Sequence, residues 1–263
     1  MSKTLGLALG SGGSRGIAHI GVLLALEEAG IKPDFITGCS MGSVVGGCYA
    51  AGMPAEKIRD IALQLKARDL LDIGAGFVSR MSVLRTKKME DLLLEILGDM
   101  QIENMKIPFR CVATDLYSGK LHVFESGPAA VAIQASSTIP CVFKPVSHEG
   151  MLLVDGGCLC RVPSKQVKEM GADVVIAVDA LVNTYEPVEK VDNILELVLR
   201  VFDIMDSQQT EMHAALDGDV ADILLKPEIK GMSQYQIKDL DKAFEEGYKI
   251  GKENIYKIRE LLL

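Results

Sequence analysis

The fold class is decided by residues 4–52, TLGLALGSGGSRGIAHIGVLLALEEAGIKPDFITGCSMGSVVGGCYAAG. A short apolar run at 4–10 predicts a buried strand, and the glycine-rich segment 11–16 predicts a tight loop after it. A helix then ends at a glycine, a second strand follows at 34–40, and a helix of small residues closes the stretch. Because strands alternate with helices here, the stretch predicts an α/β fold with a parallel sheet.

The rest of the chain continues this alternation. Further helices are expected at 54–65, 88–98, 127–138, 188–217 and 238–262, a strand and turn at 108–119 with a hairpin partner at 120–126, and strands at 151–157 and 172–180. The 263 residues contain no internal repeat, low-complexity tract or linker. We therefore expect one domain over 1–263.

Composition and charge exclude several classes of protein. Hydrophobic residues make up 48% of the chain, yet no apolar run approaches the roughly 18 residues of a membrane span. The N-terminal segment runs into a glycine loop rather than a cleavage site, so we read no signal peptide and expect a cytoplasmic protein. The net charge of −8 argues against a nucleic-acid binder, whose surface would be basic.

The six cysteines give no sign of a metal site. They form no CxxC pair, and no histidine lies near Cys158 and Cys160 at zinc-finger spacing. We therefore expect buried, reduced thiols and no bound metal.

The glycine loop after the first strand has three readings. Gly10, Gly12 and Gly16 come close to the dinucleotide-binding fingerprint, but the second strand lacks the acidic residue expected at its end. Backbone N–H groups at a helix N-terminus also form a cradle for an oxyanion or a phosphate, to which Arg15 would add positive charge. The third reading is a tight turn that only packs helix against strand.

A G-x-S-x-G motif, Gly38-Cys39-Ser40-Met41-Gly42, lies between the second strand and the helix after it. In this context it predicts a nucleophile elbow, with Ser40 at the carboxyl edge of the sheet and the N–H of Met41 near an oxyanion. Gly38 and Gly42 would permit the sharp turn and close helix packing. The alternative is that Ser40 only caps the helix. Cys39 should point away from Ser40, because strand side chains alternate, and we assign it to packing.

A serine nucleophile needs a base, and none of the four histidines ends a clear parallel strand. His148, in the loop VSHEG, is the least unsuitable of them. Asp155 is a better partner, because it ends the apolar strand MLLVD at a functional edge and is followed by Gly156. A buried carboxylate within reach of a serine hydroxyl can accept its proton, although Asp155 could instead cap the turn. Weaker candidates are two other strand-ending carboxylates, Asp115 and Asp179.

Three segments, in this order, resemble the motifs of the patatin-like phospholipase family: Gly12-Gly13-Ser14-Arg15-Gly16, Gly38-Cys39-Ser40-Met41-Gly42 and Asp155-Gly156-Gly157. The segments GIAHIGVLLALEEAGI and ASSTIPCVFKPV are also similar to family sequences. The resemblance covers residues 5–180 well and 181–263 loosely. It implies a three-layer α/β sandwich around a mainly parallel sheet, hydrolysis of lipid acyl esters, and no metal or nucleotide cofactor.

The resemblance also implies a role for each motif. Ser40 would be the nucleophile and Asp155 the base of a Ser–Asp dyad. Gly12, Gly13 and Met41 would supply the oxyanion hole, with Arg15 supporting the loop or the phosphate of the substrate. One departure is Ser11, which stands where the family often has glycine.

Two other functions stay open at this point. One is a lipid-binding or regulatory module that lacks catalysis, and the other is a nucleotide-dependent oxidoreductase. Residues 66–88 mix apolar and basic side chains and could form a lid or a patch for peripheral membrane contact, or an ordinary solvated loop. The sequence predicts no oligomeric state.

Overall fold

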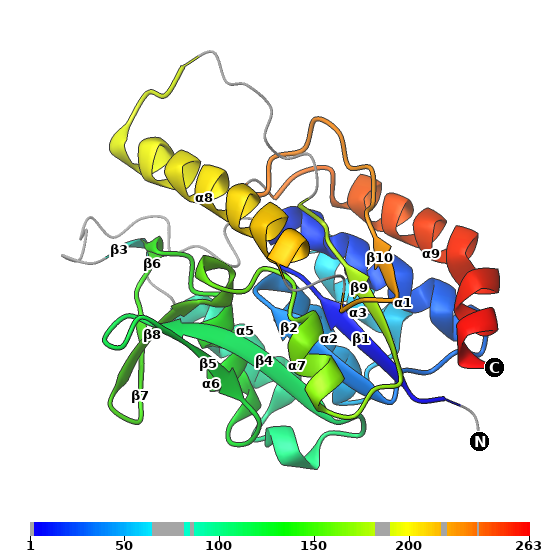
Figure 1. Ribbon diagram of the computed structural model, residues 1–263. Helices are drawn as coiled ribbons and strands as arrows, with labels where there is room; N and C mark the ends of the chain where they lie inside the picture. Colours follow the sequence, from blue (N-terminus) through cyan, green and yellow to red (C-terminus); the bar gives the residue numbers. More distant parts are fainter. Residues whose placement is uncertain (1–2, 65–81, 85–86, 182–189, 217–219, 236) are drawn as a thin grey trace.

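The computed structural model describes residues 3–64, 82–84, 87–181, 190–216, 220–235 and 237–263 (Figure 1). Five described strands of its main sheet run parallel, in the order β10 (Ile223–Leu225), β9 (Val174–Val178), β1 (Leu5–Leu9), β2 (Phe35–Cys39) and β4 (Phe109–Asp115). Three more pair antiparallel, β5 (Lys120–Phe124), β7 (Val146–His148) and β8 (Met151–Asp155). The predicted α/β fold with a mainly parallel sheet is confirmed.

The central strand β1 is buried on both faces, as expected for a parallel sheet covered by helices. Leu5, Leu7 and Leu9 belong to the larger hydrophobic core on one face. Ala8 belongs to a smaller cluster on the other face, which includes Val167. The period-two alternation of the strand thus divides its side chains between two layers.

Helices cover both faces of the sheet, which completes the three layers (Figure 1). The larger core packs against α1 (Ala18–Glu28), α2 (Met41–Ala50), α3 (Ala55–Gln64), α5 (Lys87–Leu97), α6 (Ala129–Ser136) and α9 (Leu240–Leu262). The short helix α7 (Ser164–Glu169) packs on the other face through Val167. Helix α8 (Ile194–Leu216) lies outside both cores and contacts β6 (Cys141–Phe143) and the 3-10 turn Gly156–Cys158.

Strands β2 and β8 meet end to end along one edge of β4. Residues 111–115 of β4 pair with β5, which occupies one of the two edges that a strand possesses. β2 pairs with residues 109–112 of β4 and β8 with residues 113–115, so both lie on the remaining edge. β2 is parallel to β4 and β8 is antiparallel to it. The last residues of the two strands therefore face each other.

The direction of β8 differs from our expectation and changes the explanation for the position of Asp155. We expected its strand to deliver it to the edge where parallel strands end, but β8 runs in the opposite direction. Asp155 still reaches the end of β2 because the two strands converge. The direction of a strand depends on its sheet partner, which the local sequence does not encode.

Other expectations have mixed outcomes. Cys39, Cys48 and Cys111 are buried as expected, but Cys141 is exposed and the remaining two cysteines are half-buried. Of the segment 66–88, residues 66–81 and 85–86 lie outside the described residues. Its described part includes β3 (Ser82–Leu84), which pairs with β6. Among the described helices, none combines the length and the low charge that crossing a bilayer requires.

Candidate active site

Ser40 forms a sharp turn between β2 and α2, with φ 52° and ψ −124°. Such a backbone is strained for a residue with a side chain and is typical of a nucleophile elbow. The turn is possible because its glycines allow close packing: a Cβ on Gly42 would lie 2.1 Å from the carbonyl oxygen of Leu9, and one on Gly38 would lie 2.5 Å from the Cα of Ser43. The Ser40 side chain makes no capping hydrogen bond to α2.

The Ser40 hydroxyl instead donates a hydrogen bond to Asp155, with Oγ 2.6 Å from Oδ2. The other carboxylate oxygen, Oδ1, accepts from the N–H of Gly157 at 2.8 Å. One carboxylate oxygen thus caps the turn, and the other accepts the Ser40 hydroxyl; a role of Asp155 as the base stays a prediction. Because both side chains are almost fully buried, the pair is largely shielded from bulk water.

The segment Ser136-Ser137-Thr138 fixes both partners of this pair. The hydroxyl of Ser136 accepts from the N–H of Ser40 at 3.0 Å, and the hydroxyl of Ser137 donates to the Ser40 carbonyl at 3.2 Å. The carbonyl of Thr138 accepts from the N–H of Asp155 at 2.8 Å. Our sequence reasoning assigned these residues no role, although they belong to the family-like segment ASSTIPCVFKPV. The available signal was a run of three hydroxyl residues at a helix C-terminus.

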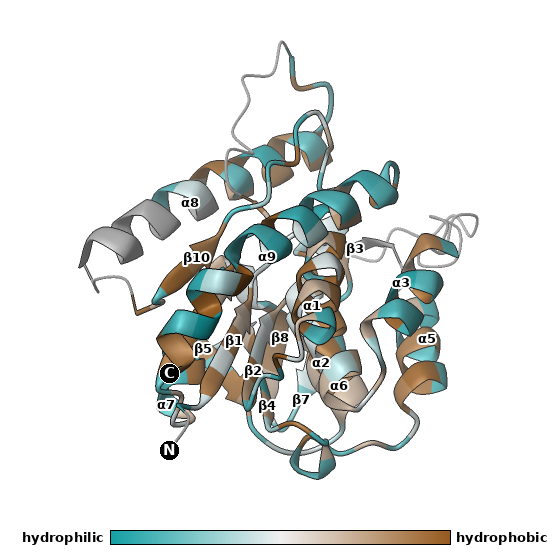
Figure 2. Ribbon diagram, turned by 90° about the vertical axis from the view of Figure 1, so that its right-hand side faces the viewer, coloured by the Kyte–Doolittle hydropathy of each residue, from teal (hydrophilic) through white to brown (hydrophobic). Residues whose placement is uncertain are grey.

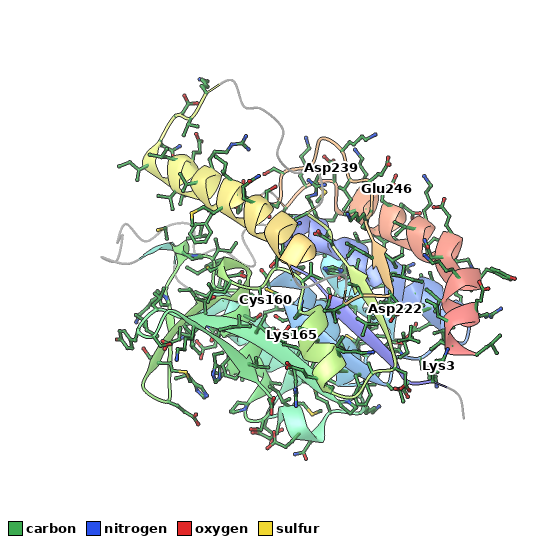
Figure 3. All side chains as sticks on the ribbon, viewed as in Figure 1. Lys3, Cys160, Lys165, Asp222, Asp239 and Glu246 are labelled. Carbon is green, nitrogen blue, oxygen red and sulfur yellow. The ribbon has the colours of Figure 1, made fainter. Side chains whose placement is uncertain are left out.

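Cys39 lies closer to the dyad than we expected. Its thiol is fully buried, 3.1 Å from the hydroxyl of Ser11 and 3.9 Å from Oδ1 of Asp155. The alternation argument fails because Ser40 has left the strand conformation. Even so, Cys39 is fully buried and is not among the residues that line the pocket, so packing remains our interpretation. The thiol of Cys160, labelled in Figure 3, lies 3.6 Å from Oε1 of Gln166, and burial raises its pKa to about 12.

Gly12 and Gly13 line the same pocket as Ser40 and Asp155. Among the described residues, no hydrogen bond acceptor is found for the N–H groups of these two glycines. The neighbouring N–H groups are occupied, since that of Ser11 donates to Arg161 and that of Arg15 to Gly12. The loop therefore has two backbone donors at the pocket with no acceptor among the described residues, and Ser11 is not one of them.

A glycine is required at position 13 by the backbone conformation and by the loop that packs against it. Gly13 has φ +48°, and a Cβ there would lie 2.2 Å from the carbonyl oxygen of Gln234. That carbonyl also accepts from the N–H of Ser14 at 3.0 Å. The glycine loop is thus held against a loop more than 200 residues later in the chain.

The side chain of Arg15 does not enter the catalytic pocket. It is buried, and its Nη2 donates to the carbonyl of Ile229 at 2.7 Å. It lines a second pocket next to the first. Of its two expected roles, this geometry fits support of the loop, and contact with a substrate phosphate stays a prediction. Met41 begins α2, and its side chain packs against Gly16.

The walls of the catalytic pocket are mainly apolar. Ile139 and Pro140 follow the hydroxyl segment, Leu181 follows β9, and Phe202 comes from α8. Tyr235 contributes an aromatic ring from the loop after β10. A mainly apolar pocket with a few converging polar groups suits an acyl chain attached to a reactive carbonyl.

Neither His148 nor His19 is placed to act as the base. His148 pairs with Met151, the first residue of β8. Met151 is four residues from Asp155, a distance of about 13 Å along a strand. His19 is fully buried, and its Nε2 lies 2.8 Å from the carbonyl oxygen of Gly10. Burial lowers the pKa of His19 to about 4. Neither side chain lines the catalytic pocket.

The two weaker carboxylate candidates have structural roles. Asp115 accepts hydrogen bonds from the N–H groups of Tyr117 and Leu152 and from the hydroxyl of Ser118, and these bonds lower its pKa to about 2. Asp179 forms a buried ion pair with Arg161, with 2.7 Å between Oδ2 and Nη2. Both carboxylates are therefore fully engaged away from Ser40.

Known proteins share the sequence pattern and the fold of this chain. The model of the patatin-like phospholipase family matches residues 7–167. An uncharacterized NTE family protein of Mycobacterium tuberculosis is 44% identical over 177 residues, which cover 67% of this chain and 49% of that protein. Lysophospholipase nte1 of Neurospora crassa is 28% identical over 290 residues, which cover 98% of this chain and 18% of that protein. This chain thus spans about half the length of the first relative and less of the second.

Two solved structures share the fold. VipD from Legionella pneumophila superposes with a TM-score of 0.61 at 14% identity, covering 97% of this chain and 67% of that chain. Human GIVD cytosolic phospholipase A2 superposes with a TM-score of 0.59 at 13% identity, covering 99% of this chain and 59% of that chain. At such low identity the likeness concerns the fold alone. Because the family model spans more than half of the sequence, from β1 into α7, this chain belongs to the patatin-like phospholipase family.

Proposed function

We propose that this protein hydrolyses acyl esters of lipids or phospholipids through a Ser40–Asp155 dyad. The observation that carries the proposal is the 2.6 Å contact between Ser40 Oγ and Asp155 Oδ2. The contact lies in a pocket that also exposes Gly12 and Gly13. A nucleophile, a base and free backbone donors around one cavity are the parts that acyl transfer needs.

The reaction begins when Ser40 attacks the ester carbonyl and Asp155 takes its proton. The tetrahedral intermediate collapses, the leaving alcohol takes the proton, and an acyl group stays on Ser40. Water then attacks this acyl-enzyme and gives one proton to Asp155. Collapse of the second tetrahedral intermediate releases the carboxylic acid, and Asp155 returns the proton to the Ser40 oxygen. The hydrogen bond from Gly157 to Oδ1 keeps Oδ2 directed at the serine throughout.

The oxyanion is held by the N–H groups of Gly12, Gly13 and Met41 in this proposal. Gly12 and Gly13 line the pocket, and Met41 is the first residue of α2, where N–H groups lack helical acceptors. The partial positive charge of the helix N-terminus favours an anion at the same place. Arg15 holds the loop through Ile229.

Two alternatives have less support. A dinucleotide-dependent oxidoreductase would use the glycine loop, but β2 ends at the serine turn rather than at a ribose-binding acid. A non-catalytic lipid-binding module would not need the serine and the carboxylate to be aligned, and both are present. The cytoplasmic location, the single domain and the absence of a cofactor remain predictions.

The test is hydrolysis of a soluble short-chain ester such as p-nitrophenyl butyrate. Ser40→Ala and Asp155→Asn should each reduce kcat by at least about 1,000-fold while leaving the melting temperature near that of the wild type. His148→Ala is the matched control and should keep nearly full activity. Full activity in either dyad variant would rule out the dyad, and loss in the His148 variant would favour a triad.

A further inference from the structure

One side of helix α8 carries five apolar side chains that are exposed on the surface of the protein. Ile194, Leu197, Val201, Ile204 and Met205 are exposed, with between 38% and 80% of their surface accessible. At 3.6 residues per turn these five side chains span an arc of about 100°. We call them the outer stripe. Figure 2 shows hydrophobic residues along the described part of this helix, which runs at the edge of the molecule.

The opposite side of α8 faces the protein with polar groups and with half-buried apolar side chains such as Leu199. Asp203 accepts hydrogen bonds from Gln234 Nε2, at 2.6 Å, and from the hydroxyl of Tyr235. Arg200 and Asp203 line the second pocket, and Phe202 lines the catalytic one. Apolar residues therefore lie on both sides of α8, whereas a surface helix of a globular protein normally keeps charged or polar residues on its outer side. The bonds to Asp203 hold α8 in this orientation.

The outer stripe lies close to the mouth of the catalytic pocket. Phe202 and Asp203, which follow Val201 directly in the same helix, both line that pocket. The helix also contacts the turn Gly156–Cys158, which follows Asp155. The stripe and the pocket are thus separated by about one helix diameter, roughly 10 Å.

We propose that the outer stripe docks the protein on the surface of a phospholipid bilayer, so that the catalytic pocket opens against the lipid. The inference rests on the proposed function, because a lipid ester must pass from an aggregate into the pocket. An apolar helix side of this kind lies in the interfacial region of a bilayer, where its side chains leave water. The same contact would bring Phe202 and the pocket entrance to the lipid surface.

The charge of the molecule predicts which kind of lipid surface it binds. The five side chains of the stripe carry no charge, and the whole chain carries a formal net charge of −8. Docking therefore depends on apolar burial rather than on attraction to anionic lipid. Binding should occur on vesicles of zwitterionic phosphatidylcholine and should change little between low and moderate salt. Docking through the basic residues of 66–88 would instead require anionic lipid and would weaken with salt.

The experiment measures co-sedimentation with phosphatidylcholine vesicles. The double substitution Leu197→Gln/Ile204→Gln removes apolar surface without changing the net charge, and the background variant Ser40→Ala keeps the lipid intact. The double variant should bind vesicles at least about tenfold more weakly, because burying even one aliphatic side chain is worth that factor. The control Tyr256→Gln, at a residue 81% exposed on α9, should bind like its parent.

The outcomes separate docking from catalysis. In the Ser40-containing protein, the double variant should lose activity on vesicles and keep activity on p-nitrophenyl butyrate. Unchanged vesicle binding in the double variant would overturn the docking proposal. The proposal would also fail if the wild type were a dimer and the double variant a monomer, because the outer stripe would then be covered by a second copy of the chain. If vesicle binding falls as expected but neither substrate is hydrolysed by the wild type, docking stands and the proposed hydrolase function fails.

Discussion

Cys39 and Asp155 lie opposite consecutive residues of one strand, Val112 and Ala113 of β4. They come from strands that run in opposite directions and end at the same point of that edge. Ser40 follows Cys39 directly, and its sharp turn projects the hydroxyl toward the carboxylate. The dyad is therefore a product of sheet register, because its two members are 115 positions apart in the sequence. Any change that shifts this register should separate the pair.

The glycine loop offers the first prediction. Gly13→Ala places a methyl group against the carbonyl of Gln234, 2.2 Å from the Cβ position, so the loop must move and its N–H groups must leave the oxyanion. We expect kcat on a soluble ester to fall by at least about 100-fold, the loss typical of one oxyanion donor.

The matched control for this substitution is Gly30→Ala. Gly30 also has a positive φ, +69°, but no atom lies within 4 Å of its Cβ position. Both variants carry the backbone strain, which costs about 1 kcal/mol of stability, so only the contact with Gln234 differs. Equal activity in the two variants would show that the loop does not hold the oxyanion.

Ser136 offers a second prediction, because its hydroxyl is the acceptor for the N–H of Ser40. Ser136→Ala leaves that buried N–H without its acceptor, which costs about 1–3 kcal/mol and lets the turn relax. We expect kcat to fall by about tenfold with KM unchanged, because the serine is positioned less well in every state.

The control removes a buried hydrogen bond of β2, the strand that leads to Ser40, at a position away from the dyad. Thr37 donates to the carbonyl of Pro163 at 2.8 Å, and Thr37→Val should lower the melting temperature without lowering kcat. If the two variants lose kcat to the same degree, Ser136 contributes only stability.

His19 offers a prediction on pH. Its Nε2 lies 2.8 Å from the Gly10 carbonyl, and its Nδ1 has no hydrogen-bond partner among the described residues, so the ring is buried in the neutral form. Burial lowers its pKa to about 4, whereas in the unfolded chain the pKa is about 6.5. Between these values the unfolded chain binds a proton that the folded protein does not bind, so the free energy of unfolding falls as pH falls.

The size of this effect follows from the two pKa values. Acidification from pH 7 to pH 4 should remove about 3 kcal/mol of stability through His19. His19→Gln keeps a donor for the Gly10 carbonyl but does not titrate, so denaturant unfolding across this range should show a correspondingly flatter pH profile. The same profile in both proteins would place the acid sensitivity elsewhere.

The sequence alone was sufficient to predict the elements that depend on a local pattern of residues. The strand–loop–helix order of residues 4–52, the serine turn and the carboxylate after an apolar strand each follow from spacing and glycine positions. The antiparallel direction of β8 was not accessible, because it depends on a partner strand. For the same reason the support of Ser40 by Ser136 and the contact of Gly13 with Gln234 were missed. Such contacts join segments that no local pattern relates.

The central claim is that Asp155 activates Ser40 as a covalent nucleophile. Its most direct test is labelling by a fluorophosphonate probe, followed by peptide mass mapping of wild type and Asp155→Asn. The account predicts that the wild-type protein is labelled on Ser40 alone, and that the variant reacts at least about 100-fold more slowly, the usual contribution of a general base. Labelling at another residue, or an unchanged rate in Asp155→Asn, would contradict it.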